Sequence, residues 1–197
     1  MPKRLIIAID CDDVLVPTTE YLVTQYNKLY KAQVQLRDAH LDNNPEWVAV
    51  GKQKVLERLH SIQLSKGFQA LSPFADAVEV VNALAQEHEL HLLTARSLEV
   101  ADTTNKMIER YFKGCFTGVQ HVGVDLPKGV ICAQLHADVM IDDNLNYLRS
   151  VVKQSIPLAI WFGDFPWQHE HANELHSVQR CSNWAVVREV IDDYAAR

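Results

Sequence analysis

The chain has 197 residues, a net charge of −6 and a hydrophobic fraction of 48%. This length suits a single domain, with or without an insertion, that buries a substantial core. An acidic balance without a basic tract argues against a nucleic-acid polymer as the main partner, although nucleotides remain open as substrates.

The first predicted element is a buried strand at residues 5–9, LIIAI, which runs into Asp10. Residues 17–72 then contain two segments with helical patterning, 18–32 and 50–65, separated by a stretch at 37–48 that is expected to be irregular. No strand is evident in this region. We therefore expect a helical insertion at 17–72, and a core domain made of residues 1–16 and 73–197.

Apolar runs alternate with amphipathic stretches after residue 70, which is typical of an α/β domain. Further strands are predicted at 89–95, 116–122, 138–142 and 156–162. Helices are predicted at 74–88, 97–112 (with Ser97 as N-cap), 127–136, 144–154 and 183–197. Helices of this length between strands imply right-handed crossovers and a mainly parallel sheet. The fold class expected is a Rossmann-like three-layer α/β sandwich.

The cysteines are Cys11, Cys115, Cys132 and Cys181, and they lack the close pairing of a metal site or a disulfide framework. They are expected to be reduced thiols. No apolar run approaches the roughly 20 residues of a membrane-spanning helix, and the opening MPKRLIIAID turns acidic too soon for a signal peptide. We expect a cytoplasmic protein without a membrane partner.

Polar residues follow several of these strands. Ligands in open α/β sheets bind beyond the carboxyl ends of the strands. The residues expected at that edge are Asp10, Asp12, Asp13, Thr94, Ala95, Arg96, Lys128, Asp142, Asp143 and Asn144. Clustered carboxylates with one lysine suit a hard cation and a phosphoryl group: the acids hold Mg²⁺, and the lysine and the threonine hydroxyl address phosphate oxygens.

Four motifs occur in a fixed order over residues 5–144. Asp10-Cys11-Asp12-Asp13-Val14 fits the pattern DxDx[T/V], Thr94 ends an apolar strand, Lys128 begins a helix, and VMIDDN at 139–144 supplies paired acids. This set resembles the haloacid dehalogenase superfamily, and the helical insertion resembles its C1-type cap. LLTARS, IDDN, the short cap and NWAVVREVI are similar to the 5′(3′)-deoxyribonucleotidase group, also called cytosolic 5′-nucleotidase type C.

The resemblance implies a role for each residue. Asp10 is the nucleophile that forms an aspartyl-phosphate, and Asp12 is the general acid and base that also lends its backbone carbonyl to Mg²⁺. Lys128 neutralises charge between Asp10 and the phosphate. Asp142 is expected to bind the metal directly, whereas Asp143 is expected to bind through water or to orient the lysine.

Other residues have less defined roles. Thr94 and the Ala95 amide are expected to contact phosphoryl oxygens. Arg96 either adds a positive contact to the phosphate or pairs with a surface acid, and both readings stay open. Asp13 fills the variable position of its motif and is expected at a helix start or in solvent.

Three further sets of residues are weaker candidates. His169, His171 and His176 with Cys181 allow a zinc site, although a solvated loop is the commoner reading of such histidines. Trp167 is a candidate wall of the active site. Tyr21, Trp47 and Phe68 are candidates for stacking on a base, with burial in the cap core as the alternative.

These expectations describe a Mg²⁺-dependent phosphomonoesterase, with nucleoside monophosphates as the favoured substrates by resemblance. One alternative is a phosphatase for sugar or other metabolite phosphates. A second is a phosphomutase or phosphotransferase with the same residues. A third, from another class, is a non-catalytic binding protein that retains the fold.

Overall fold

The computed structural model describes residues 2–40, 44–123, 126–171 and 177–197. Its sheet has the strand order β3-β2-β1-β4-β5-β6, and every neighbouring pair is parallel. The strands are β1 (Ile6–Ile9), β2 (Glu89–Thr94), β3 (Phe116–His121), β4 (Val139–Asp142), β5 (Leu158–Phe162) and β6 (Gln179–Cys181).

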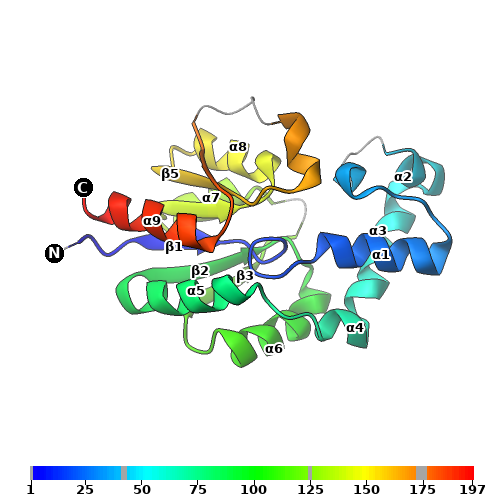
Figure 1. The fold of residues 1–197 in the computed structure, drawn as a ribbon, viewed down its shortest axis with the longest axis horizontal. Helices are drawn as coiled ribbons and strands as arrows, with labels where there is room; N and C mark the ends of the chain where they lie inside the picture. Colours follow the sequence, from blue (N-terminus) through cyan, green and yellow to red (C-terminus); the bar gives the residue numbers. More distant parts are fainter. Residues whose placement is uncertain (1, 41–43, 124–125, 172–176) are drawn as a thin grey trace.

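Helices cover both faces of this sheet (Figure 1). Ile7 and Ile9 of β1 pack in one apolar cluster with α5 (Ala75–Glu87) and α9 (Trp184–Ala195), and Met107 of α6 (Ala101–Tyr111) joins that cluster. Ala8, which points to the opposite face, packs with α7 (Lys128–Gln134) and α8 (Leu145–Lys153). A strand buried on both faces needs a continuous apolar run, which LIIAI supplies. The three-layer α/β fold is confirmed.

Helices α1 (Thr19–Tyr30), α2 (Pro45–Val50), α3 (Lys52–Gln63) and α4 (Lys66–Gln69) lie beyond one end of the sheet (Figure 1). They have an apolar cluster of their own, built on Val23, Tyr26, Val34, Val55 and Ile62. Arg58 of α3 donates a hydrogen bond to the Tyr26 hydroxyl (3.0 Å) and lies over the Tyr30 ring. These contacts give the helical group an internal packing separate from that of the sheet.

The structure departs from the sequence predictions in several places. β6 is a three-residue strand that was not expected, and α2 lies within the stretch expected to be irregular. Short 3₁₀ turns at Leu36–Asp38 and Pro166–His171 were also missed. The helix expected over 97–112 begins instead with a 3₁₀ turn (Leu98–Val100), and the Ser97 side chain makes no capping hydrogen bond.

The strand order places β1 between β2 and β4, so that neighbouring crossovers leave β1 in opposite directions. A crevice forms at such a point, beyond the carboxyl ends of the strands. Figure 1 shows helices α1 and α3 beyond that same end. The acids that follow β1 and β4 therefore enter the space between the sheet and the helical group.

Candidate active site

The loop after β1 is a tight turn that fixes the directions of its acids. The Asp10 amide donates to the Ile141 carbonyl of β4 (2.9 Å), which extends the pairing of the two strands by one residue. The Leu15 and Val16 amides both donate to the Cys11 carbonyl, and the Asp13 amide donates to the Val16 carbonyl. This backbone network holds Asp10 and Asp12 at the carboxyl edge of the sheet.

Lys128 forms the centre of a buried ion-pair network. Its Nζ lies 2.6 Å from Asp10 Oδ1 and 2.8 Å from Asp142 Oδ2, and its side chain has no exposed surface. The Tyr147 ring covers the same ammonium at 4.4 Å from the ring centroid. Lysine is tolerated without solvent only when it is paired in this way. The neighbouring carboxylates outweigh burial and raise the pKa of Lys128.

The packing of α7 on α8 places this lysine. Gly129 follows Lys128, and a Cβ added at Gly129 would lie 2.2 Å from the Ser150 carbonyl oxygen of α8. The Gly129 amide also donates to Ser150 Oγ (3.0 Å). Because only glycine allows this approach, α7 sits close enough for Lys128 to reach the ends of β1 and β4.

Asp143 is the third buried acid of the group. Its backbone carbonyl accepts hydrogen bonds from Trp161 Nε1 (2.8 Å) and Gln168 Nε2 (2.9 Å), and its Oδ2 accepts one from Trp167 Nε1 (3.2 Å). The Lys128 ammonium contacts Asp10 and Asp142 rather than Asp143. Trp167, expected as a wall of the active site, thus holds an acid of that site.

Asp10, Asp142 and Asp143 each offer an oxygen, and these oxygens lie within 4.8 Å of one another. Burial is the main cause that raises the pKa of Asp10, to about 8, and it also raises the pKa values of Asp142 and Asp143. Three carboxylates facing one ammonium leave negative charge uncompensated. Oxygen ligands at this spacing suit a hard divalent cation such as Mg²⁺, so the donor set fits that ion.

Arg96 binds Asp12, whereas the sequence analysis considered only the phosphate or a surface acid as its partner. Arg96 donates from Nη2 to Asp12 Oδ1 (2.7 Å) and from Nε to both carboxylate oxygens (3.1 and 3.0 Å). Thr18 Oγ1 also donates to Asp12 Oδ1 (2.6 Å). Burial raises the pKa of Asp12, but Arg96 and Thr18 outweigh it and lower the pKa below its usual value. The partner of Arg96 is therefore an acid of the site and not a surface acid.

Asp13 caps helix α1 and is buried, so the helix-start reading holds and the solvated one is wrong. Its Oδ1 accepts hydrogen bonds from the Thr18 and Thr19 amides (2.9 and 3.0 Å), and Thr19 Oγ1 also donates to its carboxylate. Asp13 itself has φ of 57°, in the left-handed region. The acid thus stabilises both the turn after β1 and the start of α1.

Replacing Asp13 by alanine is expected to lower the free energy of unfolding by about 1–3 kcal/mol, from the lost cap and from an alanine forced into left-handed backbone. Asparagine tolerates that backbone and keeps one acceptor, so Asp13→Asn should lose less. Urea unfolding measures both losses. Equal stability of the wild type and the alanine variant would contradict the capping role.

Thr94 is the last residue of β2, and Ala95 and Arg96 follow it at the carboxyl edge of the sheet. Thr94 has no exposed surface, and its Oγ1 accepts a hydrogen bond from the Arg96 amide (3.1 Å). Ala95 and Arg96 line the cavity described next, whereas neither Thr94 nor Lys128 is among the residues described as lining it. The structure thus places the threonine and the lysine directly behind the cavity wall.

A cavity of about 750 Å³ opens between the acids and the helical group. Its far wall is one face of α3, with Gln53, Leu56, Glu57, Leu59, His60 and Gln63, and Tyr147 and Leu22 also line it. His60 Nε2 of α3 lies 3.2 Å from Glu99 Oε2, which joins α3 to the turn after β2. Sequence patterning missed these residues, because α3 reads as an ordinary amphipathic helix.

The aromatic residues expected to stack on a base are used elsewhere. Phe68 is buried against Tyr21 (6.1 Å between centroids), and Trp47 packs edge-on against Tyr26 (5.0 Å). Within the described part of the chain, the cavity wall includes none of Tyr21, Trp47 and Phe68. The alternative reading, burial within the helical group, fits these contacts.

The histidine-rich segment is described only in part. His169 lies 3.1 Å from Asp164, and both side chains are exposed. Cys181 is buried on β6. The side chain of His171 and the whole of His176 lie outside the described residues. Among the residues that are described, neither His169 nor Cys181 belongs to a group with metal-ligand spacing.

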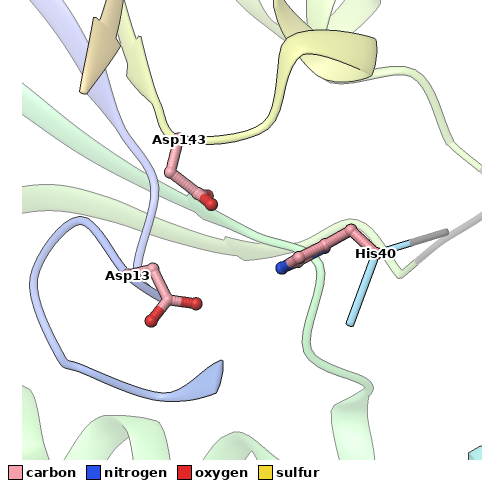
Figure 2. Close-up of side chains that lie close together, drawn as sticks. All are labelled: Asp13, His40 and Asp143. Atoms are coloured by element: carbon pink, nitrogen blue, oxygen red, sulfur yellow. The ribbon is translucent and has the colours of Figure 1, made fainter. Parts of the chain in front are cut away.

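A histidine that sequence analysis did not single out also reaches the site. Figure 2 shows His40, Asp13 and Asp143 pointing toward a common space, and their ligand atoms lie within 4.8 Å of one another. His40 lines the cavity, and its Nε2 lies 3.3 Å from Thr19 Oγ1. The Asp13 oxygens in this group are already engaged in capping α1.

Comparison with known proteins agrees with this arrangement. A family model described as "5′ nucleotidase, deoxy (Pyrimidine), cytosolic type C protein" matches residues 4–197. Comparison with curated protein sequences gives no match.

Solved structures resemble the chain over nearly its whole length. A haloacid dehalogenase-like hydrolase from Streptococcus pneumoniae has a TM-score of 0.71 at 13% identity, with 95% of this chain and 98% of that one covered. A superfamily hydrolase of subfamily IA from Geobacter sulfurreducens has 0.62 at 14%, covering 97% and 96%. YfnB from Bacillus subtilis, bound to magnesium, has 0.63 at 9%, covering 96% and 100%.

At these identities the solved structures show the shared fold, and the family model extends the likeness to the sequence itself. The described part of the chain contains no helix long and apolar enough to cross a membrane. The chain belongs to the cytosolic type C family of 5′-nucleotidases, within the haloacid dehalogenase superfamily of hydrolases.

Proposed function

We propose that the chain is a Mg²⁺-dependent phosphomonoesterase that hydrolyses nucleoside monophosphates through an aspartyl-phosphate on Asp10. The observation that carries this proposal is the buried network in which Lys128 joins Asp10 to Asp142, beside the cavity and next to Asp143. The type C family match supports a nucleotide as substrate, and its description as cytosolic supports a cytoplasmic location.

The metal would be held by the side chains of Asp10, Asp142 and Asp143, with the Asp12 backbone carbonyl as a further ligand. Mg²⁺ commonly keeps several waters, so this set from the protein suffices. When bound, it would neutralise charge on the carboxylates and on the phosphoryl oxygens. The magnesium bound to YfnB, which shares this fold, supports the choice of ion.

The residues of this chain would divide the reaction into two steps. In the first, Asp10 attacks phosphorus, the bond from phosphorus to the ester oxygen breaks, and Asp12 passes a proton, which it takes up from the monoanion of the phosphate ester, to the leaving alkoxide. In the second, Asp12 takes a proton from water as that water attacks phosphorus and releases Asp10. Lys128 stabilises the Asp10 carboxylate and the charge that accumulates on the phosphoryl group.

The cavity favours a substrate with one phosphoryl group and an uncharged remainder. The α3 wall offers two amides, two leucines, Glu57 and His60, which is paired with Glu99, and no lysine or arginine. A second phosphate in this part of the cavity would meet the acidic Glu57 side chain without a lysine or arginine to compensate it. We propose that residues 17–72 act as a cap whose α3 face contacts the nucleoside.

The substrate class is tested by initial rates of phosphate release with Mg²⁺ across deoxynucleotides, ribonucleotides and sugar phosphates. The proposal expects nucleoside monophosphates to give the highest kcat/KM. A preference for sugar phosphates would favour the alternative that the protein is a phosphatase for sugar or other metabolite phosphates. Transfer to added alcohols that outpaces hydrolysis would favour a phosphotransferase, and no activity on any ester would favour a non-catalytic binding protein.

Removing divalent cations should abolish turnover. With EDTA in excess we expect phosphate release to fall to background, because Asp10, Asp142 and Asp143 then repel the substrate phosphate. Excess MgCl₂ should restore the rate. Full activity after exhaustive chelation would contradict the proposed metal requirement.

A further inference from the structure

We propose that Arg96 is a positioning residue, which orients the Asp12 carboxylate for proton transfer and is not a ligand of the substrate phosphate. This inference rests on the proposed function, because it assigns the arginine a task within the same reaction. The sequence left two readings for Arg96, contact with the phosphate or pairing with a surface acid. The contacts around its guanidinium group favour an indirect role through Asp12.

The edge of the guanidinium formed by Nε and Nη2 is fully used by Asp12. Three hydrogen bonds of 2.7–3.1 Å run from this edge to the two carboxylate oxygens. A planar arginine fork recognises a carboxylate and a phosphate through the same geometry. To bind a phosphate in that mode, Arg96 would have to release Asp12.

The remaining surfaces of the guanidinium are also engaged. Nη1 donates to Thr104 Oγ1 of α6 (3.2 Å), and the Phe68 ring of α4 lies 5.0 Å from the guanidinium carbon. The Arg96 side chain is 3% exposed. A side chain fixed by partners on three elements has little freedom to follow a substrate, so it is suited to hold its partner still.

The orientation of Asp12 is set from both sides. Arg96 holds the carboxylate from the strand β2 side, and Thr18 at the start of α1 donates to the same oxygen Oδ1 (2.6 Å). Proton transfer requires the donor within hydrogen-bond reach of the leaving oxygen. A carboxylate free to rotate would occupy that geometry for only part of the time, and the chemical step would slow accordingly.

A general acid matters most when the leaving group is a poor one. The alkoxide of a nucleoside needs a proton as it leaves, whereas p-nitrophenolate is stable without one. Loss of Asp12 positioning should therefore reduce kcat/KM, which reports the first step, for a deoxynucleoside monophosphate and leave kcat/KM for p-nitrophenyl phosphate nearly unchanged. The second step, in which Asp12 acts as the base, is common to both substrates, so kcat does not separate them. Loss of a phosphate ligand would instead weaken both substrates and inorganic phosphate together, because all three present the same group.

The test compares wild type and Arg96→Met on these two substrates, with inorganic phosphate as competitive inhibitor. We expect kcat/KM for the deoxynucleotide to fall by about 10–100-fold, which is a fraction of the full effect of a general acid. The inhibition constant of phosphate and kcat/KM for p-nitrophenyl phosphate should stay within about threefold. A tenfold weaker inhibition by phosphate, or equal losses of kcat/KM on both substrates, would overturn the proposal.

A second variant guards against loss of folding. Thr104→Val keeps the guanidinium and removes its support at Nη1, together with the hydrogen bond from Thr104 Oγ1 to the Val100 carbonyl (3.4 Å). It should show the same selective loss of kcat/KM on the deoxynucleotide, at about 3–10-fold. A Thr104→Val enzyme that loses kcat/KM equally on both substrates would also overturn the proposal.

A double-mutant cycle with Asp12→Asn completes the test. If Arg96 acts through Asp12, Arg96→Met should cause no further loss of deoxynucleotide turnover in the Asp12→Asn background. Independent, multiplying losses would contradict the inference. Failure of the proposed function is distinguishable, since the wild type would then fail to hydrolyse the deoxynucleotide before any variant is compared.

Discussion

Asp10→Asn is expected to lower kcat for phosphate release by at least about 10⁴-fold, since an amide cannot serve as the nucleophile. The side chain keeps its size, so the variant should fold and give the wild-type circular dichroism spectrum. Loss of the ion pair with Lys128 will reduce its stability, because the ammonium then retains only Asp142 as a charged partner. Initial rates at saturating substrate measure the effect.

Asp13→Asn is the matched control for this loss. It makes the same chemical change in the same loop, at an acid that caps α1 and is assigned no step in the reaction. We expect it to retain kcat within about tenfold of the wild type. An Asp10→Asn protein with a near-normal rate would contradict the assignment of Asp10 as the nucleophile.

Lys128→Met should impair both stability and activity. The change leaves Asp10 and Asp142 buried without their common cation, and breaking such a buried pair costs about 3–5 kcal/mol. It also removes the charge that offsets the approach of two anions, which lowers kcat by about 10²–10³-fold. Urea unfolding and initial rates measure the two losses.

Magnesium distinguishes the two consequences of the Lys128 change. If the acids bind Mg²⁺, adding the ion should recover part of the lost stability, because it binds the folded state and neutralises the same carboxylates. The control is Lys113→Met, which removes an exposed lysine paired with Glu109 and should change stability by less than about 1 kcal/mol. A Lys128→Met protein as stable as this control would contradict the buried network.

The core of the fold is predictable because local sequence and tertiary packing agree there. The strands β1, β4 and β5 are largely apolar on both faces, as is typical of central parallel strands, and β2 is apolar apart from Glu89 and His91 on one face and Thr94 at its end. The helices between these strands have amphipathic spacing. β6 was missed because three residues, two of them exposed and polar, carry no periodic signal. α2 was missed although Asn44 caps it and Pro45 occupies its first turn, a pair of signals that sequence analysis can use.

The proximity of the acids could also be predicted, since the carboxyl ends of parallel strands share one edge of a sheet. The individual contacts that these side chains make could not be predicted. Arg96 and Asp12 are 84 positions apart, and either a phosphate or a carboxylate satisfies an arginine. The cavity wall on α3 depends on how the helical group packs against the sheet end. Side-chain patterning within one helix carries no information about that placement.

The central claim is that the phosphoryl group passes through Asp10. The most direct measurement is mass spectrometry of peptides from enzyme that is quenched in acid during turnover of a deoxynucleoside monophosphate with Mg²⁺. The account predicts one phosphoryl group on the peptide that contains Asp10, and none on that peptide in Asp10→Asn. Turnover without a phosphorylated Asp10 peptide, or with the phosphoryl group on another residue, would contradict it.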